Sequence, residues 1–114
     1  MTTRPQLPTV TVARSANRAE TVTVLATDQG MPIEITFEHS EYRYGAQALA
    51  DEILRLTRRA TIAARTRHRE MLAEAGAPDH IMDKLGLPTR QAAMDELDRI
   101  GDEDTEPTIW IRPV

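Results

Sequence analysis

The chain has 114 residues, a net charge of −4 and no cysteine. This length suits one domain, the negative charge argues against a general nucleic-acid coat protein, and the missing thiols exclude disulfides, thiolate metal sites and cysteine nucleophiles. Only 4% of the residues are aromatic. The core must therefore be built from Val, Ile, Leu and Ala, and so modest a core favours dimerisation.

We expect no signal peptide at the N-terminus. MTTRPQLPTV lacks the apolar stretch of a signal peptide, and no apolar run approaches the roughly 20 residues that span a membrane. We therefore expect a cytoplasmic protein without membrane association. We expect a flexible arm at residues 1–7, one α+β domain at 8–100, and an acidic linker with an extended tail at 101–114.

Three segments alternate β-branched and polar residues, which predicts strands at about residues 8–15, 20–27 and 32–38. Short turns separate them, and Gly30 stands where the second turn needs a positive φ. The pattern predicts a three-stranded antiparallel meander with one apolar face. The strand residues expected in the core are Val22, Val24, Ile33, Ile35 and Phe37.

The strongest periodicity lies at about residues 45–75, where apolar residues recur at steps of three and four. It predicts one long helix that covers the sheet and stops at Gly76. Two short helices follow: HIMDKL, ending at Gly86, and RQAAMDELDRI, capped by Pro88 and Thr89. The long-helix residues expected in the core are Leu49, Ile53, Leu56 and Ala60.

The predicted fold is therefore α+β: a three-stranded antiparallel meander packed on one long helix, followed by two short helices and an extended C-terminal tail. The tail, TIWIRPV, alternates in polarity and suits an edge strand, to which Pro113 would confine it. Apolar residues off the main helix stripe would otherwise be exposed, and we expect them to mark a homodimer contact. They are Leu54, Ile62 and Leu72.

Arginine is concentrated in the long helix. Between Asp51 and Glu70, six Arg stand against three acidic residues, a local charge of +3. Such a face can contact nucleic acid or an acidic partner, or it can be a solvated surface with pairs such as Asp51 and Arg55. On either reading, reversing the charge of Arg58 and Arg59 should leave folding intact. The residues predicted to bind a partner are Arg55, Arg58, Arg59, Arg65 and Arg69, together with Trp110 in the tail.

No catalytic or metal-binding pattern stands out. His39, His68 and His80 lie in separate segments without metal-ligand spacing, and the glycines form neither a P-loop nor GxGxxG. Ser40 and Glu41 follow His39, but a catalytic triad is a spatial arrangement that neighbours in sequence do not make. We therefore expect a non-enzymatic protein without a metal or cofactor.

Several segments together resemble a known group of proteins. They are the TVTV strand at Thr21–Val24, the Asp28–Gly30 turn, ALADEIL at Ala48–Leu54, and Gly86–Pro88 before an alanine-rich acidic helix. These segments resemble the EspD/EspH group of mycobacterial type VII (ESX) secretion-associated proteins, over residues 20–100. The order of strands, turn and long helix also resembles the YbaB/EbfC family of small bacterial proteins.

Each resemblance implies a function. The EspD/EspH group implies a chaperone-like accessory protein that binds a type VII secretion substrate or component. Tyr42 and Tyr44 are followed at the Tyr-x-x-x-Asp/Glu spacing by Ala46 and Ala48, and no Trp-x-Gly turn occurs, which indicates an accessory factor rather than an exported substrate. The YbaB/EbfC family implies the alternative, a nucleoid-associated DNA-binding protein, although its usual domain has a long helix before the sheet.

Overall fold

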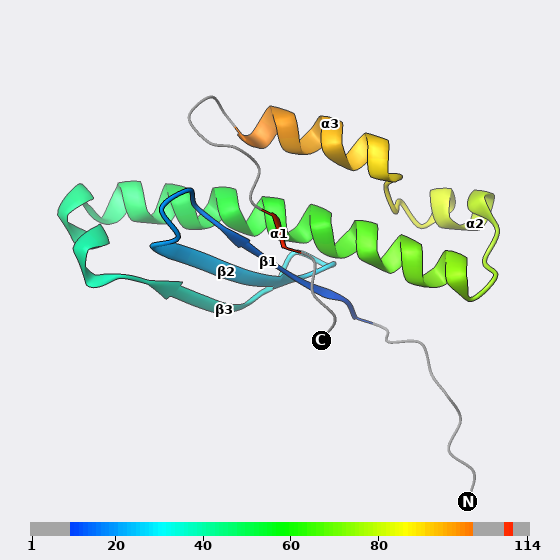
Figure 1. The fold of residues 1–114 in the computed structure, drawn as a ribbon, viewed down its shortest axis with the longest axis horizontal. Coiled ribbons are helices and arrows are strands. Elements are labelled where there is room, and N and C mark those ends of the chain that lie inside the picture. Colours follow the sequence, from blue (N-terminus) through cyan, green and yellow to red (C-terminus); the bar gives the residue numbers. More distant parts are fainter. Residues whose placement is uncertain (1–9, 102–108, 111–114) are drawn as a thin grey trace, which may run out of the picture.

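The computed structural model describes residues 10–101 and 109–110 (Figure 1). It confirms the α+β class, with an antiparallel sheet lying against one long helix. The elements in chain order are β1 (Val12–Ala16), β2 (Val22–Thr27), β3 (Pro32–Phe37), the 3₁₀ helix η1 (His39–Tyr44), α1 (Ala46–Glu74), α2 (Asp79–Lys84), α3 (Arg90–Gly101) and β4 (Ile109–Trp110).

The sheet contains the predicted meander and one further strand. Its order is β3-β2-β1-β4, and every pair is antiparallel. In β4, Trp110 lies opposite Arg14 and Ile109 opposite Ser15. The segment predicted as an edge strand or an extended tail therefore pairs with β1. The strand at the other edge of the sheet is β3.

The main core lies between α1 and the two strands β1 and β2. Leu56 of α1 is fully buried, at the centre of the apolar stripe that the periodicity predicted. Further along α1, the second cluster of buried hydrophobic residues consists of alanines, with Ala63 and Ala64 of α1 against Ala13 of β1. The main cluster consists of Val22, Val24, Ala26, Leu49, Leu56 and Ala60, with Phe37 and Ile53 packed against it.

Two residues predicted in the core are outside it. Ile33 and Ile35 of β3 are 51% and 41% exposed, although Ile35 pairs with buried Val24 and so lies on the same face. The reason is that α1 lies over β1 and β2 and hardly reaches the edge strand. A register irregularity in the β2–β3 pairing, at Leu25 and Ala26, further shifts the start of β3.

Turns and caps follow the sequence closely. Gly30 and Gly76 adopt positive φ, 87° and 97°, as predicted. At the end of α1, the Gly76 N–H donates to the Ala73 carbonyl (3.0 Å) and the Ala77 N–H donates to the Leu72 carbonyl (2.9 Å), a Schellman ending. The Thr89 hydroxyl accepts a hydrogen bond from the Ala92 N–H (3.1 Å), confirming this predicted cap of α3.

Two polar contacts join α1 to the sheet side of the molecule. The Thr11 hydroxyl donates to the Ala64 carbonyl (2.7 Å) and is buried. His68 Nδ1 lies 2.8 Å from an Asp28 carboxylate oxygen in the β2–β3 turn. Because hydrogen bonds have strict geometry, both contacts fix the position of α1 along the sheet.

Candidate functional site

The predicted basic face of α1 is not one continuous exposed surface. Arg59 is 1% exposed, and its Nη1 donates to the Leu97 carbonyl of α3 (3.3 Å). Neither reading of Arg59 made from the sequence, a partner-binding residue or a solvated one, fits this burial, because the sequence pattern showed which face the sheet covers but not that α3 covers a second face. A guanidinium can be buried when its donors find acceptors.

Two further arginines hold the α2–α3 connection against α1. Arg65 Nη2 donates to the Gly86 carbonyl. Arg69 Nη1 donates to the Leu87 carbonyl (2.7 Å) and to an Asp83 carboxylate oxygen (2.8 Å). Both side chains therefore have structural partners, and each hydrogen bond is strengthened by the guanidinium charge.

The other two α1 arginines that were predicted to bind a partner, Arg55 and Arg58, lie nearer the start of the helix. Arg55 forms a bidentate pair with Glu52, at 2.9 Å for each hydrogen bond. Arg58 is exposed. Within the described ranges we find no hydrogen bond or ion pair from the Arg58 side chain, so among these five arginines it is the one most available for a carboxylate or phosphate.

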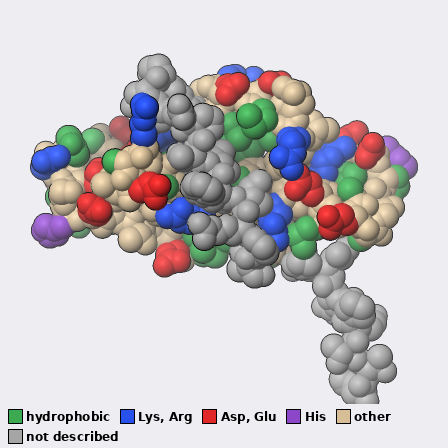
Figure 2. All heavy atoms as spheres, viewed as in Figure 1, with side chains coloured by type: hydrophobic (Ala, Val, Ile, Leu, Met, Phe, Trp, Pro, Cys, Tyr) green, Lys and Arg blue, Asp and Glu red, His purple; other side chains and the backbone are tan. Residues whose placement is uncertain are grey.

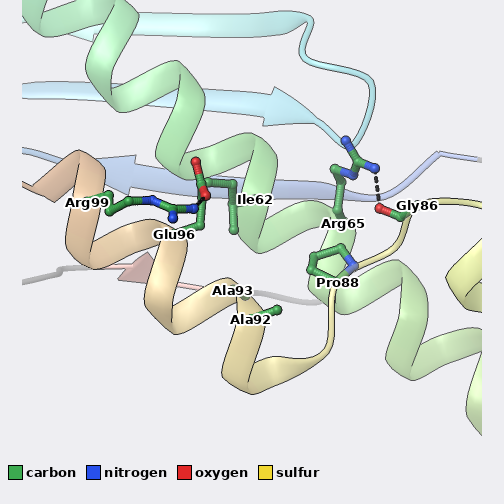
Figure 3. A pocket seen from close by; sticks show the side chains of 8 residues that line it. All are labelled: Ile62, Arg65, Gly86, Pro88, Ala92, Ala93, Glu96 and Arg99. Carbon is green, nitrogen blue, oxygen red and sulfur yellow. Dashed lines mark hydrogen bonds and ion pairs between the residues drawn. The ribbon is translucent and has the colours of Figure 1, made fainter.

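A groove follows the line where α3 crosses α1, and Figure 3 shows one part of it, the hollow lined by Ile62, Arg65 and Glu96 among others. It consists of three adjoining hollows of about 390, 380 and 290 Å³. The first and third share Arg58 and Ile100, and the second and third share Ile62 and Glu96. The hollows therefore form one continuous surface, which we call the α1–α3 groove.

The groove combines apolar and charged side chains. Leu54 and Ile62 come from α1 and Ile100 from α3, and Leu54 is 56% exposed. Figure 3 shows Glu96 and Arg99 beside Ile62, and Arg65 pointing to Gly86 at the other end. Four arginines (55, 58, 65 and 99) stand against two acids, Asp51 and Glu96, in the lining, and Glu52, the partner of Arg55, is a third acid beside it, so the local charge is 4 − 3 = +1.

Outside the groove the charges are mixed. Figure 2 shows basic and acidic side chains interspersed on the face viewed, without a broad basic area among the described residues. A nucleic-acid surface usually gathers several free cations along one face. The distribution on this face therefore favours local protein contacts over a phosphate-binding surface.

The sequence predicted part of this site. It singled out Arg55, Arg58 and Arg65, and also Leu54 and Ile62 as off-stripe apolar residues, all of which line the groove. It missed the α3 wall. The available signal was the i,i+3 pair of Glu96 and Arg99, which the structure joins as an ion pair, beside the small residues that begin α3.

Metal sites and membrane spans are both absent from the described part of the chain. No group of three His, Cys, Asp or Glu side chains there could hold a metal ion. No helix in that part is both long and apolar enough to cross a bilayer. Comparisons with protein-family models, with curated proteins and with solved structures find no match to the chain.

Proposed function

We propose that this chain is a non-enzymatic, cytoplasmic, chaperone-like accessory factor that binds a protein partner in type VII (ESX) secretion. The observation that carries the proposal is the α1–α3 groove, where exposed Leu54 and half-buried Ile62 lie beside arginines. Aromatic or aliphatic anchors surrounded by charges are typical of protein interfaces. The EspD/EspH resemblance supports the choice of secretion partner.

Capture at native expression tests this function. A tagged copy of the chain, used as bait in a mycobacterial lysate, should enrich a secretion-linked protein over an unrelated tagged bait of similar charge. Quantitative mass spectrometry provides the measurement. Recovery of the same proteins by both baits would count against the accessory role.

DNA binding of the YbaB/EbfC kind is the second candidate. Among the five arginines predicted to bind a partner it would depend mainly on Arg58, because Arg59 is buried and Arg65 and Arg69 are bonded to the α2–α3 connection. Few phosphate contacts give weak binding that salt removes readily. We expect no change in the anisotropy of a labelled duplex at physiological salt. Tight binding that weakens steeply between 50 and 200 mM salt would instead favour the DNA function.

We also propose that the protein forms a homodimer, through β3. The Glu38 N–H donates to the carbonyl of Thr21, the residue before β2 (2.8 Å). Because strand groups alternate, the N–H and C=O of Ile35 point away from β2, to the free edge. Antiparallel pairing about a twofold axis at Ile35 would place Glu34 opposite Thr36, so that no two carboxylates are directly opposed.

A further inference from the structure

We infer that the α1–α3 groove takes an amphipathic helix with acidic flanks, supplied by a partner protein. This inference rests on the proposed function and specifies the chemistry of the partner. It is carried by the arrangement of apolar and cationic side chains along one line of α1, by the wall that α3 adds, and by the positive charge of the groove in an acidic chain.

The shape of the groove suits a helix. Leu54, Arg58, Ile62 and Arg65 follow one another at steps of four, four and three residues, so they form one stripe along α1. The stripe covers about 16 Å at 1.5 Å per residue, or about three turns of a helix packed beside it. A bound helix satisfies its own backbone, and the groove walls are helices that have no free strand edge to pair with an extended peptide.

The charge of the groove selects an acidic partner. The whole chain carries −4, whereas the groove residues together with Glu52, the partner of Arg55, sum to +1. Arg58 is exposed, and the Arg99 side chain is 71% exposed although it pairs with Glu96. Carboxylates on the flanks of a bound helix can reach both guanidinium groups while its apolar face covers Ile62. A lysine-flanked helix would meet repulsion from the same two arginines.

The apolar residues that line the groove argue against a phosphate ligand. Ile100 and Ile62 line the groove between the arginines, and a phosphate backbone gains nothing from covering them. An amphipathic helix buries them, at a gain of roughly 25 cal/mol for each Å² of apolar surface removed from water. The mixture of the two residue types therefore fits an acidic helix better than either a nucleic acid or a purely apolar segment.

Two matched synthetic peptides provide the probe. Both are helical, about 16 residues long, with Leu at i, i+3, i+4 and i+7 repeats; one has Glu at the flanking positions and the other has Lys. Fluorescence anisotropy with the full chain at low salt should show the Glu peptide binding at least about tenfold more tightly than the Lys peptide. Added salt should reduce this difference.

Variants of the chain locate the binding. Arg58→Glu with Arg99→Glu should abolish or reverse the preference for the Glu peptide, and Ile62→Asp should weaken both peptides. Arg43→Glu provides the control, because Arg43 is an exposed arginine of η1 that does not line the groove. Circular dichroism establishes that each variant is folded before its binding is compared.

Three results would overturn the inference: equal binding of the two peptides, binding of neither, or an unchanged preference in the Arg58→Glu, Arg99→Glu variant. The lysate capture separates this failure from a failure of the proposed function. If that variant still enriches the secretion-linked protein, the accessory role stands and the partner binds elsewhere. If wild type captures no such protein while the Glu peptide binds selectively, the groove stands and the secretion role is wrong.

Discussion

At the scale of single residues, two leucines of α1 that are two positions apart have opposite environments. Leu56 is fully buried and Leu54 is 56% exposed. Leu56→Ala should lower the free energy of unfolding by about 2–5 kcal/mol, because it removes buried carbons and leaves a cavity. Leu54→Ala should cost less than about 0.5 kcal/mol, the usual range for surface positions. Urea denaturation measures both, and similar losses would mean that the core face is assigned incorrectly.

Neighbouring arginines show the same contrast. Arg59→Glu places a carboxylate beside the Leu97 carbonyl in a buried site, and we expect a loss of more than about 3 kcal/mol. Arg58→Glu should change stability by less than about 0.5 kcal/mol. The expectation that reversing both charges spares folding is thus replaced by opposite expectations for the two residues. Thermal unfolding of each single variant tests them, and a stable Arg59→Glu protein would contradict the burial.

At the scale of elements, the α2–α3 connection depends on Gly86, whose φ is +74°. A Cβ there would lie 3.0 Å from Arg65 Nη2, the atom that donates to the Gly86 carbonyl. Gly86→Ala should therefore cost about 1–2 kcal/mol for the left-handed backbone and additionally weaken the Arg65 contact.

Gly76→Ala is the matched control for this element. Gly76 has a similar positive φ, +97°, but a Cβ there meets no atom within 4 Å, so the substitution reports backbone strain alone. Chemical denaturation should show the larger loss for Gly86→Ala. Hydrogen exchange should show loosening confined to α2 and α3. Equal losses for the two variants would mean that the Arg65 contact contributes little.

The sequence predicted the strands, helices and helix ends better than it predicted how they are covered. Alternation and helical periodicity predicted β2, β3 and α1, and glycine and threonine predicted the helix ends, because these signals depend on local geometry. The exposure of Ile35 and the burial of Arg59 depend on which neighbour covers each element. That is tertiary information, and a helical wheel for α1 cannot show that α3 covers its second face. For the same reason the sequence supplied one wall of the groove and missed the other.

At the scale of the whole molecule, the uncovered β3 edge should produce a dimer. Light scattering should give twice the 12.8 kDa mass of one chain. Ile35→Arg should shift the protein to monomer, because it places a like charge on both sides of the twofold axis. Leu85→Lys, an exposed apolar residue outside β3, is the control and should remain dimeric.

A substitution in the groove tests whether the dimer contact lies there and not at β3. Leu54→Asp tests the earlier expectation that Leu54, Ile62 and Leu72 form the dimer contact. If Leu54→Asp yields monomers while Ile35→Arg does not, the dimer uses the groove and the assignment to β3 is wrong. Micromolar wild type that scatters as one chain would exclude a dimer of either kind.

The alanine contact between α1 and the sheet has a mechanical consequence. In the first half of α1, branched side chains such as Leu56, Val22 and Val24 interlock with the sheet. In the second half, Ala63, Ala64 and Ala13 do not, so this half is held in place mainly by the Thr11–Ala64 and His68–Asp28 contacts. The easiest internal motion is then a small displacement of the second half of α1 over the sheet, with the Leu56 cluster as its fixed point. Because α3 is bonded to α1 through Arg59, the two helices would move together, and the groove would keep its shape.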